Sequence, residues 1–162
     1  MSLPKTPSQT VGPYYAIGLC RDEDGHLAGL GDTGALRLHG QLFDGDRQPV
    51  SDGMVEVWDH AGRWWARSGT DHDGRFSFVV TKPAAAGGEA PRLDVFVFAR
   101  GLLRHQLTRL YFPDEREANA ADPVLAGLAD DERARLVADA EDGALRFDIH
   151  LQGDRQTVFF DH

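Results

Sequence analysis

The stretch Arg92-Leu93-Asp94-Val95-Phe96-Val97-Phe98-Ala99 is the clearest guide to the fold of this chain. Successive side chains of a strand point to opposite faces, so Leu93, Val95 and Val97 fall on one face and the two phenylalanines on the other. Apolar residues on both faces are typical of a strand in the middle of a sheet. We therefore expect a central β-strand here.

Further strands are indicated on both sides of this stretch. In residues 35–43, three leucines alternate with polar residues, the period-two pattern of a strand with one face in water. Residues 54–58 are rich in side chains that favour strands. The remaining expected strands are 75–81, 107–112, 144–151 and 157–160. About seven or eight short strands joined by turns indicate an all-β fold, a mostly antiparallel β-sandwich.

The segments between these strands are expected to be mostly irregular. Residues 60–73 are interpreted as a short connection, and residues 113–129 as an acidic, irregular segment. Residues 130–140 contain helix formers and an acidic first turn, which Asp130 or Asp131 can cap. They predict one short helix near the C-terminus.

The stretch Thr6-Pro-Ser-Gln-Thr-Val-Gly-Pro-Tyr-Tyr15 has neither a helical period nor strand alternation. Its two prolines fix their own φ angles and bias the preceding residues away from the α region. We expect an extended N-terminal arm that ends in aromatic anchors and lies on another surface; a poorly ordered tail is the alternative. The expected organisation is one domain of residues 1–162, with the arm and a loop in 1–34 and the sandwich in 35–162.

A net charge of −9 argues against anionic partners. Nucleic acids and anionic membrane surfaces both attract a basic protein surface. No apolar run is long enough to span a bilayer, and the N-terminus lacks the basic flank and apolar core of a signal peptide. Cys20 is the only cysteine, so an internal disulfide is excluded, and a cytoplasmic location with an unreactive thiol is expected.

No residue pattern points by itself to catalysis. The chain has no glycine-rich phosphate loop, no cysteine pair with zinc spacing and no Gly-x-Ser-x-Gly elbow. Asp71-His72-Asp73-Gly74 is interpreted as a turn, because the later glutamate of a calcium loop is missing. His60 and His72 could approach each other across the short connection, which is weak evidence for a metal. Arg100 could present its guanidinium to a carboxylate, and a solvated arginine is the alternative.

Several motifs, taken in their order along the chain, resemble the aromatic-ring intradiol dioxygenases. The arm at residues 6–15 resembles the N-terminal arm of that family, and residues 40–58 and 70–83 resemble its first sandwich strands. Phe98-Ala-Arg-Gly101 and Thr108-Arg-Leu-Tyr-Phe112, with the ending at 146–160, resemble in particular the α chains of the protocatechuate-cleaving members. The resemblance covers nearly the whole chain.

The resemblance implies a β-sandwich from an enzyme family that opens catechol rings between the two hydroxyls with ferric iron and dioxygen. The family holds its iron with two tyrosines and two histidines. Here Arg92-Leu93-Asp94 stands in place of its His-x-His, residues 84–88 replace its Pro-Tyr-Pro, and the loop of the other tyrosine is shortened to residues 60–69, without a tyrosine. We therefore expect no metal in this chain and Fe(III) in a partner subunit.

The implied role is that of a non-catalytic α subunit in an αβ hetero-oligomer with a homologous, iron-binding β subunit. This chain would complete the pocket for protocatechuate, which is cleaved to 3-carboxy-cis,cis-muconate in the β-ketoadipate pathway of aromatic catabolism. By position, Thr10, Gly12, Pro13 and Tyr14 would line the pocket from the arm. Arg100 would reach the substrate and help to hold its negative charge.

Two other functions are open from the sequence. One is a non-catalytic, self-associating sandwich that binds a small aromatic acid. The other is a homomeric dioxygenase with unexpected ligands such as His60, His72 and Asp94, against which the empty ligand positions count heavily. A large exposed apolar surface would favour the subunit hypothesis, because obligate interfaces resemble a core cut in half.

Overall fold

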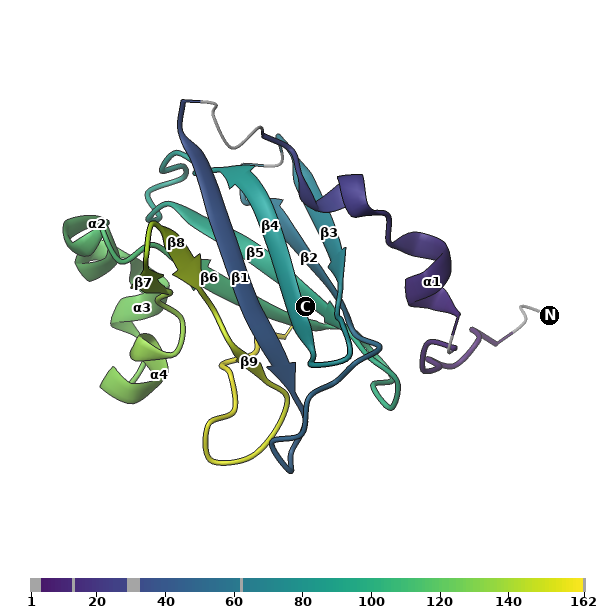
Figure 1. Cartoon of the computed structure of the whole chain (residues 1–162). Coiled ribbons are helices and arrows are strands. Elements are labelled where there is room, and N and C mark those ends of the chain that lie inside the picture. The colour runs from purple at the N-terminus through teal and green to yellow at the C-terminus, as the bar shows by residue number, and fades with distance from the viewer. Residues whose placement is uncertain (1–3, 13, 29–32, 62, 162) are drawn as a thin grey trace.

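The computed structural model describes residues 4–12, 14–28, 33–61 and 63–161. It contains two β-sheets whose inner faces share an apolar core (Figure 1). One sheet has the order β4-β1-β8-β7, with β9 paired to β1; its strands are β4 (Arg75–Thr81), β1 (Ala35–Phe43), β8 (Ala144–Arg146), β7 (Asp139–Glu141) and β9 (Ile149–His150). The other has the order β3-β2-β5-β6; its strands are β3 (Trp65–Gly69), β2 (Met54–Asp59), β5 (Arg92–Phe98) and β6 (Gln106–Tyr111). The predicted all-β sandwich is confirmed.

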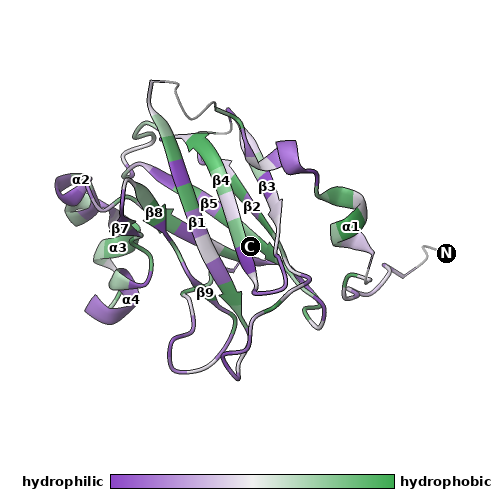
Figure 2. Cartoon of the chain, viewed as in Figure 1, coloured by the Kyte–Doolittle hydropathy of each residue, from purple (hydrophilic) through white to green (hydrophobic). Residues whose placement is uncertain are grey.

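The core is built from the alternation seen along each strand. In β1, Leu38 and Leu42 are buried, while His39 and Gln41 between them are partly exposed. Figure 2 shows the same alternation as apolar and polar segments along β1. Fully burying a leucine side chain stabilises a protein by about 1.5–3 kcal/mol. The alternation of apolar and polar residues therefore determines which face of each strand is turned to the core.

The predicted central strand has the expected place in its sheet. β5 pairs on one side with β2 and on the other with β6, both antiparallel. In the β2–β5 pair, Met54 lies opposite Phe98 and Asp59 lies opposite Leu93. This register decides which residues meet at the two ends of the pair.

The connection expected at residues 60–73 contains the strand β3, so that prediction was wrong. β3 pairs antiparallel with β2, with Gly69 opposite Met54 and Trp65 opposite Trp58. The segment Trp65-Ala-Arg-Ser-Gly69 has no β-branched residue. Its strand conformation comes from pairing with β2 rather than from local propensity.

The helix predictions were only partly right. The structure has several short helices: α1 (Tyr15–Leu19), the 3-10 helix η1 (Asp22–Gly25), α2 (Arg116–Ala121), α3 (Pro123–Ala126) and α4 (Asp130–Ala134). The helices α2, α3 and α4 lie at one side of the sandwich, and α1 lies at the opposite side (Figure 1).

The segment expected to be irregular, 113–129, holds α2 and α3. Asp122 caps α3, because its carboxylate accepts hydrogen bonds from the backbone N–H groups of Val124 and Leu125. Pro123 occupies the start of this helix, where its missing N–H costs nothing. Asp122 also accepts a hydrogen bond from the Ala90 N–H. The cap therefore depends on contacts between distant parts of the chain, which the local sequence does not reveal.

The helix expected at 130–140 ends early, at Ala134. Beyond it, the Leu136 carbonyl accepts a bond from the Tyr111 N–H, and the Ala138 N–H donates to the Tyr111 carbonyl. Leu136 is also fully buried. The backbone groups of residues 136 and 138 therefore bond to the edge of β6, whereas in a longer helix they would have bonded within the helix.

The C-terminal strand predictions also need correction. The strand expected at 144–151 is divided into β8 and β9, both parallel to β1, with Phe147 between them donating its N–H to the His39 carbonyl. The final strand expected at 157–160 is reduced to one bridge, between Leu107 and Phe160.

The N-terminal arm is not extended as far as its aromatic end. Residues 4–12 have no regular secondary structure, Tyr14 has α-helical angles, and α1 begins at Tyr15. The following segment holds η1, and His26 bridges to Val79 of β4. Across the described residues, no helix has the length and hydropathy needed to cross a membrane.

Gly40 allows β1 and the C-terminal segment to come close together, and Gly40→Ala is expected to destabilise the fold. A Cβ at this position would lie 1.9 Å from the Phe147 carbonyl oxygen and 2.6 Å from the Phe76 ring. Backbone cannot move aside as a flexible side chain can, so we expect a loss at the upper end of about 1–3 kcal/mol in unfolding free energy. Urea unfolding measures it.

The matched control for this prediction is Gly18→Ala. A Cβ on Gly18 would meet nothing within 4 Å, and alanine favours its helical position. Equal destabilisation by the two substitutions would contradict the assigned contact at Gly40.

Candidate functional site

The described part of the N-terminal arm is tied to the loop that follows β5. The backbone N–H of Gly101 donates a hydrogen bond of 2.8 Å to the Thr10 hydroxyl oxygen. Two of the predicted pocket residues, Thr10 and Arg100, are thereby brought next to each other, although 90 positions separate them in the chain.

Tyr15 fastens the end of the arm to both loops of the site. Its hydroxyl lies 2.7 Å from the Asp52 carbonyl oxygen and 2.8 Å from the Phe98 carbonyl oxygen. Burial, and next the nearby charge of Asp52, raise the pKa of this hydroxyl well above its usual range. The hydroxyl therefore remains a hydrogen-bond donor at every physiological pH.

Arg100 forms an ion pair through its Nε atom with the carboxylate of Asp52. The Arg100 side chain is 59% exposed and that of Asp52 is 28% exposed. Asp52 and Tyr15 were not among the residues predicted for this site. The aromatic end of the arm is a signal for Tyr15, whereas Asp52 lies in an ordinary polar turn and gives no local signal.

Two other predicted pocket residues, Gly12 and Tyr14, lie on the surface of this chain. Tyr14 is 77% exposed, and a Cβ on Gly12 would meet no atom within 4 Å. Pro13 lies outside the described residues. Among the described residues of the predicted pocket, Thr10 is the one that a hydrogen bond places beside Arg100, through Gly101.

The residues that stand in place of the family's His-x-His, Arg92 and Asp94, belong to a cluster of ion pairs. Arg92 donates to Asp94 at 2.9 Å and to Glu89 at 2.6 Å, and its side chain is only 8% exposed. Arg109 approaches the same two carboxylates at 4.0 and 3.7 Å. Two guanidinium groups repel a cation and neutralise the oxygens that would bind it, so these residues do not fit iron.

The histidines suggested as alternative ligands are far from each other in the fold. His60 follows the end of β2 and hydrogen-bonds through Nδ1 to the Arg92 carbonyl oxygen, at 3.0 Å. His72 follows the opposite end of the β2–β3 hairpin, in an exposed turn. The homomeric dioxygenase built on His60, His72 and Asp94 is therefore contradicted, because antiparallel pairing separates the two histidines.

Residues 71–74 form the predicted turn. Asp71 accepts hydrogen bonds from the backbone N–H groups of Asp73 and Arg75, which lower the pKa of its carboxyl group. Gly74 has a φ of +73°, a conformation that favours glycine. Asp71, His72 and Asp73 lie close together but on the surface, and their bonds within the turn explain the arrangement.

Comparison with known proteins identifies the family. The chain is 44% identical to the protocatechuate 3,4-dioxygenase alpha chain of Burkholderia cepacia, over 99% of this chain and 98% of that protein. It is 36% identical to the alpha chain of the same name from Pseudomonas putida, over 98% of this chain and 97% of that one. The chain belongs to the protocatechuate 3,4-dioxygenase alpha-chain family.

The fold of this alpha chain is shared with more distant dioxygenases. The dioxygenase domain of a dioxygenase–carbohydrate-binding protein fusion from Streptomyces sp. SirexAA-E superposes with a TM-score of 0.59 at 20% identity, covering 92% of this chain and 99% of that one. No protein-family model matches the chain.

This alpha chain is shorter than its relatives. The two alignments extend over 194 and 195 positions, whereas the chain has 162 residues, so at least 32 positions of the first alignment have no residue here. The difference agrees with the shortened segment that the resemblance implies at residues 60–69.

An aromatic row lies on the outer face of the sheet that carries Arg100. We define the aromatic row as Trp65, Trp58, Phe96, His105 and Phe98. Consecutive rings lie 5.6, 6.1, 5.4 and 5.3 Å apart between centroids. The two tryptophans are 40% and 36% exposed. Large aromatic side chains gathered on one sheet face make this row a candidate interaction surface.

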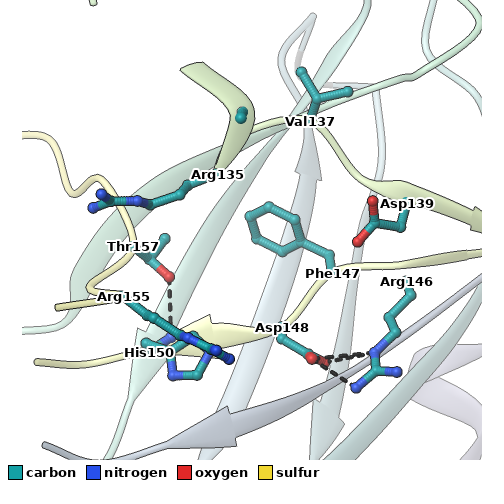
Figure 3. Close-up of a pocket in the computed structure, with 10 residues that line it drawn as sticks. Arg135, Val137, Asp139, Arg146, Phe147, Asp148, His150, Arg155 and Thr157 are labelled. Carbon is teal, nitrogen blue, oxygen red and sulfur yellow. Dashed lines mark hydrogen bonds and ion pairs between the residues drawn. The ribbon is translucent and has the colours of Figure 1, made fainter. Parts of the chain in front are cut away.

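A separate pocket lies near the C-terminal segment, between β9 and the residues after α4 (Figure 3). Two of its charged groups are paired with each other, since Asp148 accepts two hydrogen bonds from the Arg146 Nε and one from its Nη2. His150 lines this pocket and stacks on Phe43 with the ring centroids 4.8 Å apart. Burial lowers the pKa of this imidazole, and Arg155 and Arg47 lower it further against the opposing charge of Asp148.

Removing the Tyr15 hydroxyl is expected to loosen α1. In Tyr15→Phe, the carbonyls of Asp52 and Phe98 lose their shared donor, which costs about 1 kcal/mol. Amide hydrogen exchange at Gly18 and Cys20, whose N–H groups close α1, should then accelerate roughly fivefold. Tyr14→Phe is the control because the Tyr14 side chain is mostly exposed; similar acceleration in both variants would contradict the role given to Tyr15.

The His150 imidazole is expected to make stability depend on pH. Because its pKa is lower in the folded state than the ordinary 6.5, the unfolded chain binds more protons as the pH falls below that value. Unfolding free energy should thus fall between about pH 7 and pH 5, and His150→Phe, which keeps the stacked ring, should reduce the fall. The exposed His72→Gln is the control; an unchanged pH slope in His150→Phe would contradict the assignment.

Proposed function

We propose that this chain is the non-catalytic α subunit of a protocatechuate 3,4-dioxygenase. The complete enzyme adds both atoms of dioxygen to protocatechuate and yields 3-carboxy-cis,cis-muconate, a step of the β-ketoadipate pathway. One observation supports the non-catalytic role above others. In a chain related over nearly its whole length to alpha chains, Arg92 and Asp94 replace the family's His-x-His and form ion pairs with each other and with Glu89 and Arg109.

The partner in this proposal is a homologous β subunit that holds Fe(III). The alpha-chain relatives support such a partner by name, and the exposed aromatic row supplies a surface for it. The single free Cys20, whose thiol pKa is raised by burial, supports a reducing, cytoplasmic setting. The self-associating aromatic-acid binder is not favoured by these relatives.

This chain's share of the reaction is substrate binding. Protocatechuate carries a carboxylate besides its two hydroxyls, and Arg100 is an exposed cation at the end of β5. Thr10, Gly12, Pro13 and Tyr14 of the arm complete the same side of the pocket. Holding the carboxylate at a fixed place orients the ring and excludes water, which lowers the barrier without any chemistry by these residues.

The test is co-expression with the β gene from the same genome. Alone, the purified chain should contain no iron and should not open protocatechuate; co-purified with β, the complex should contain iron and turn over. Iron analysis and the absorbance change of ring opening measure both. Stoichiometric iron and turnover in the isolated chain would overturn the proposal.

A second variant separates pocket formation from assembly. Deleting residues 6–15 should lower turnover of the complex while its iron content stays the same, because the arm lines the pocket but holds no metal. Unchanged assembly and unchanged turnover after this deletion would contradict the role proposed for the arm.

A further inference from the structure

The ion pair between Arg100 and Asp52 uses only one side of the guanidinium group. The Asp52 carboxylate faces the Nε side of Arg100 in this ion pair. Across the described residues, neither Nη atom of Arg100 has a hydrogen-bond partner. The paired Nη donors are the part of an arginine that matches the two oxygens of a carboxylate.

The backbone on both sides of this ion pair is held in place. The turn that contains Asp52 is fixed by Thr70, whose hydroxyl accepts from the Gly53 N–H at 2.8 Å and donates to the Val50 carbonyl at 2.7 Å. Tyr15 then connects the Asp52 carbonyl with the Phe98 carbonyl on the neighbouring strand. A carboxylate on a fixed turn can orient a flexible arginine.

The register of the sheet explains why these two residues meet. Met54 lies opposite Phe98 in the β2–β5 pair. Asp52 lies two residues before Met54, and Arg100 lies two residues after Phe98. Because the strands are antiparallel, Asp52 and Arg100 are therefore cross-strand neighbours. Opposite charges at such positions attract each other.

We propose that Asp52 is a positioning residue for substrate specificity. It holds the Arg100 guanidinium by Nε and leaves the two Nη atoms directed to the carboxylate of an aromatic acid. This inference rests on the proposed function. Asp52 itself touches no substrate and acts by ordering one long side chain before binding, which removes an entropy cost from each binding event.

The substitution Asp52→Asn tests this role in the assembled complex with β. Asparagine keeps the size of the side chain but loses the charge that holds Arg100. We expect the ratio of kcat/KM for protocatechuate to that for catechol, which lacks the carboxylate, to fall about three- to tenfold, mainly through KM for protocatechuate. Asp154→Asn, at a carboxylate that is 97% exposed, is the control and should leave the ratio unchanged.

A second measurement needs no activity. The 1H–15Nε correlation of Arg100, assigned by its loss in Arg100→Lys, should shift and broaden in Asp52→Asn but not in Asp154→Asn. An unchanged signal would show that Asp52 does not hold Arg100 and would overturn the inference.

The outcomes separate this inference from the proposed function. If the wild-type complex does not turn over protocatechuate, the proposed function fails, whatever the NMR signal shows. If the complex turns over normally, the signal changes and the substrate ratio does not, the ion pair is purely structural and the inference is overturned. A fall in kcat for both substrates alike would equally overturn it, because it would show a general effect on the pocket.

Discussion

The antiparallel pairing of β2 with β5 is the constraint on which both ends of this molecule depend. With Met54 opposite Phe98, the strand ends bring Asp52 to Arg100, and the loops there receive Thr10 and Tyr15 of the N-terminal segment. A slip of one residue would turn Val95 and Val97 from the core to the surface, so the core itself maintains the register. Packing of the apolar face therefore fixes the geometry of the charged site.

At the other end of the same strand pair, the charges satisfy each other. Arg92 is almost completely buried and holds Glu89 and Asp94, and Arg109 adds a second positive group beside them. Such a network is expensive to break, since removing one member of a buried pair typically costs about 3–5 kcal/mol. The cluster leaves its carboxylates without free charge for a cation. It connects the 82–91 loop rigidly to strands β5 and β6.

Sequence patterns predicted the strands well because burial on one face leaves a period of two, as in β1 and β5. They failed where tertiary contacts override local preference: Trp65–Gly69 becomes a strand by pairing with β2, and the expected C-terminal helix stops at Ala134 to pair with β6. In the site, the motif around Arg100 was visible in the chain, whereas its partner Asp52 depends on the β2–β5 register, which no local pattern encodes.

The arginines at the two ends of the β2–β5 pair, Arg92 and Arg100, differ in how many hydrogen-bond donors they have free. Arg92 uses both Nη atoms on carboxylates of its own chain and is closed to any ligand. Arg100 uses only Nε, is more than half exposed, and stands beside an arm whose Tyr14 also faces outward. In the described part of the chain, the Nη atoms of Arg100 have no hydrogen-bond partner, so they are open to a ligand. This geometry supports the proposed role of Arg100 in binding a substrate carboxylate, and the aromatic row on the same sheet supports a partner surface that would enclose it.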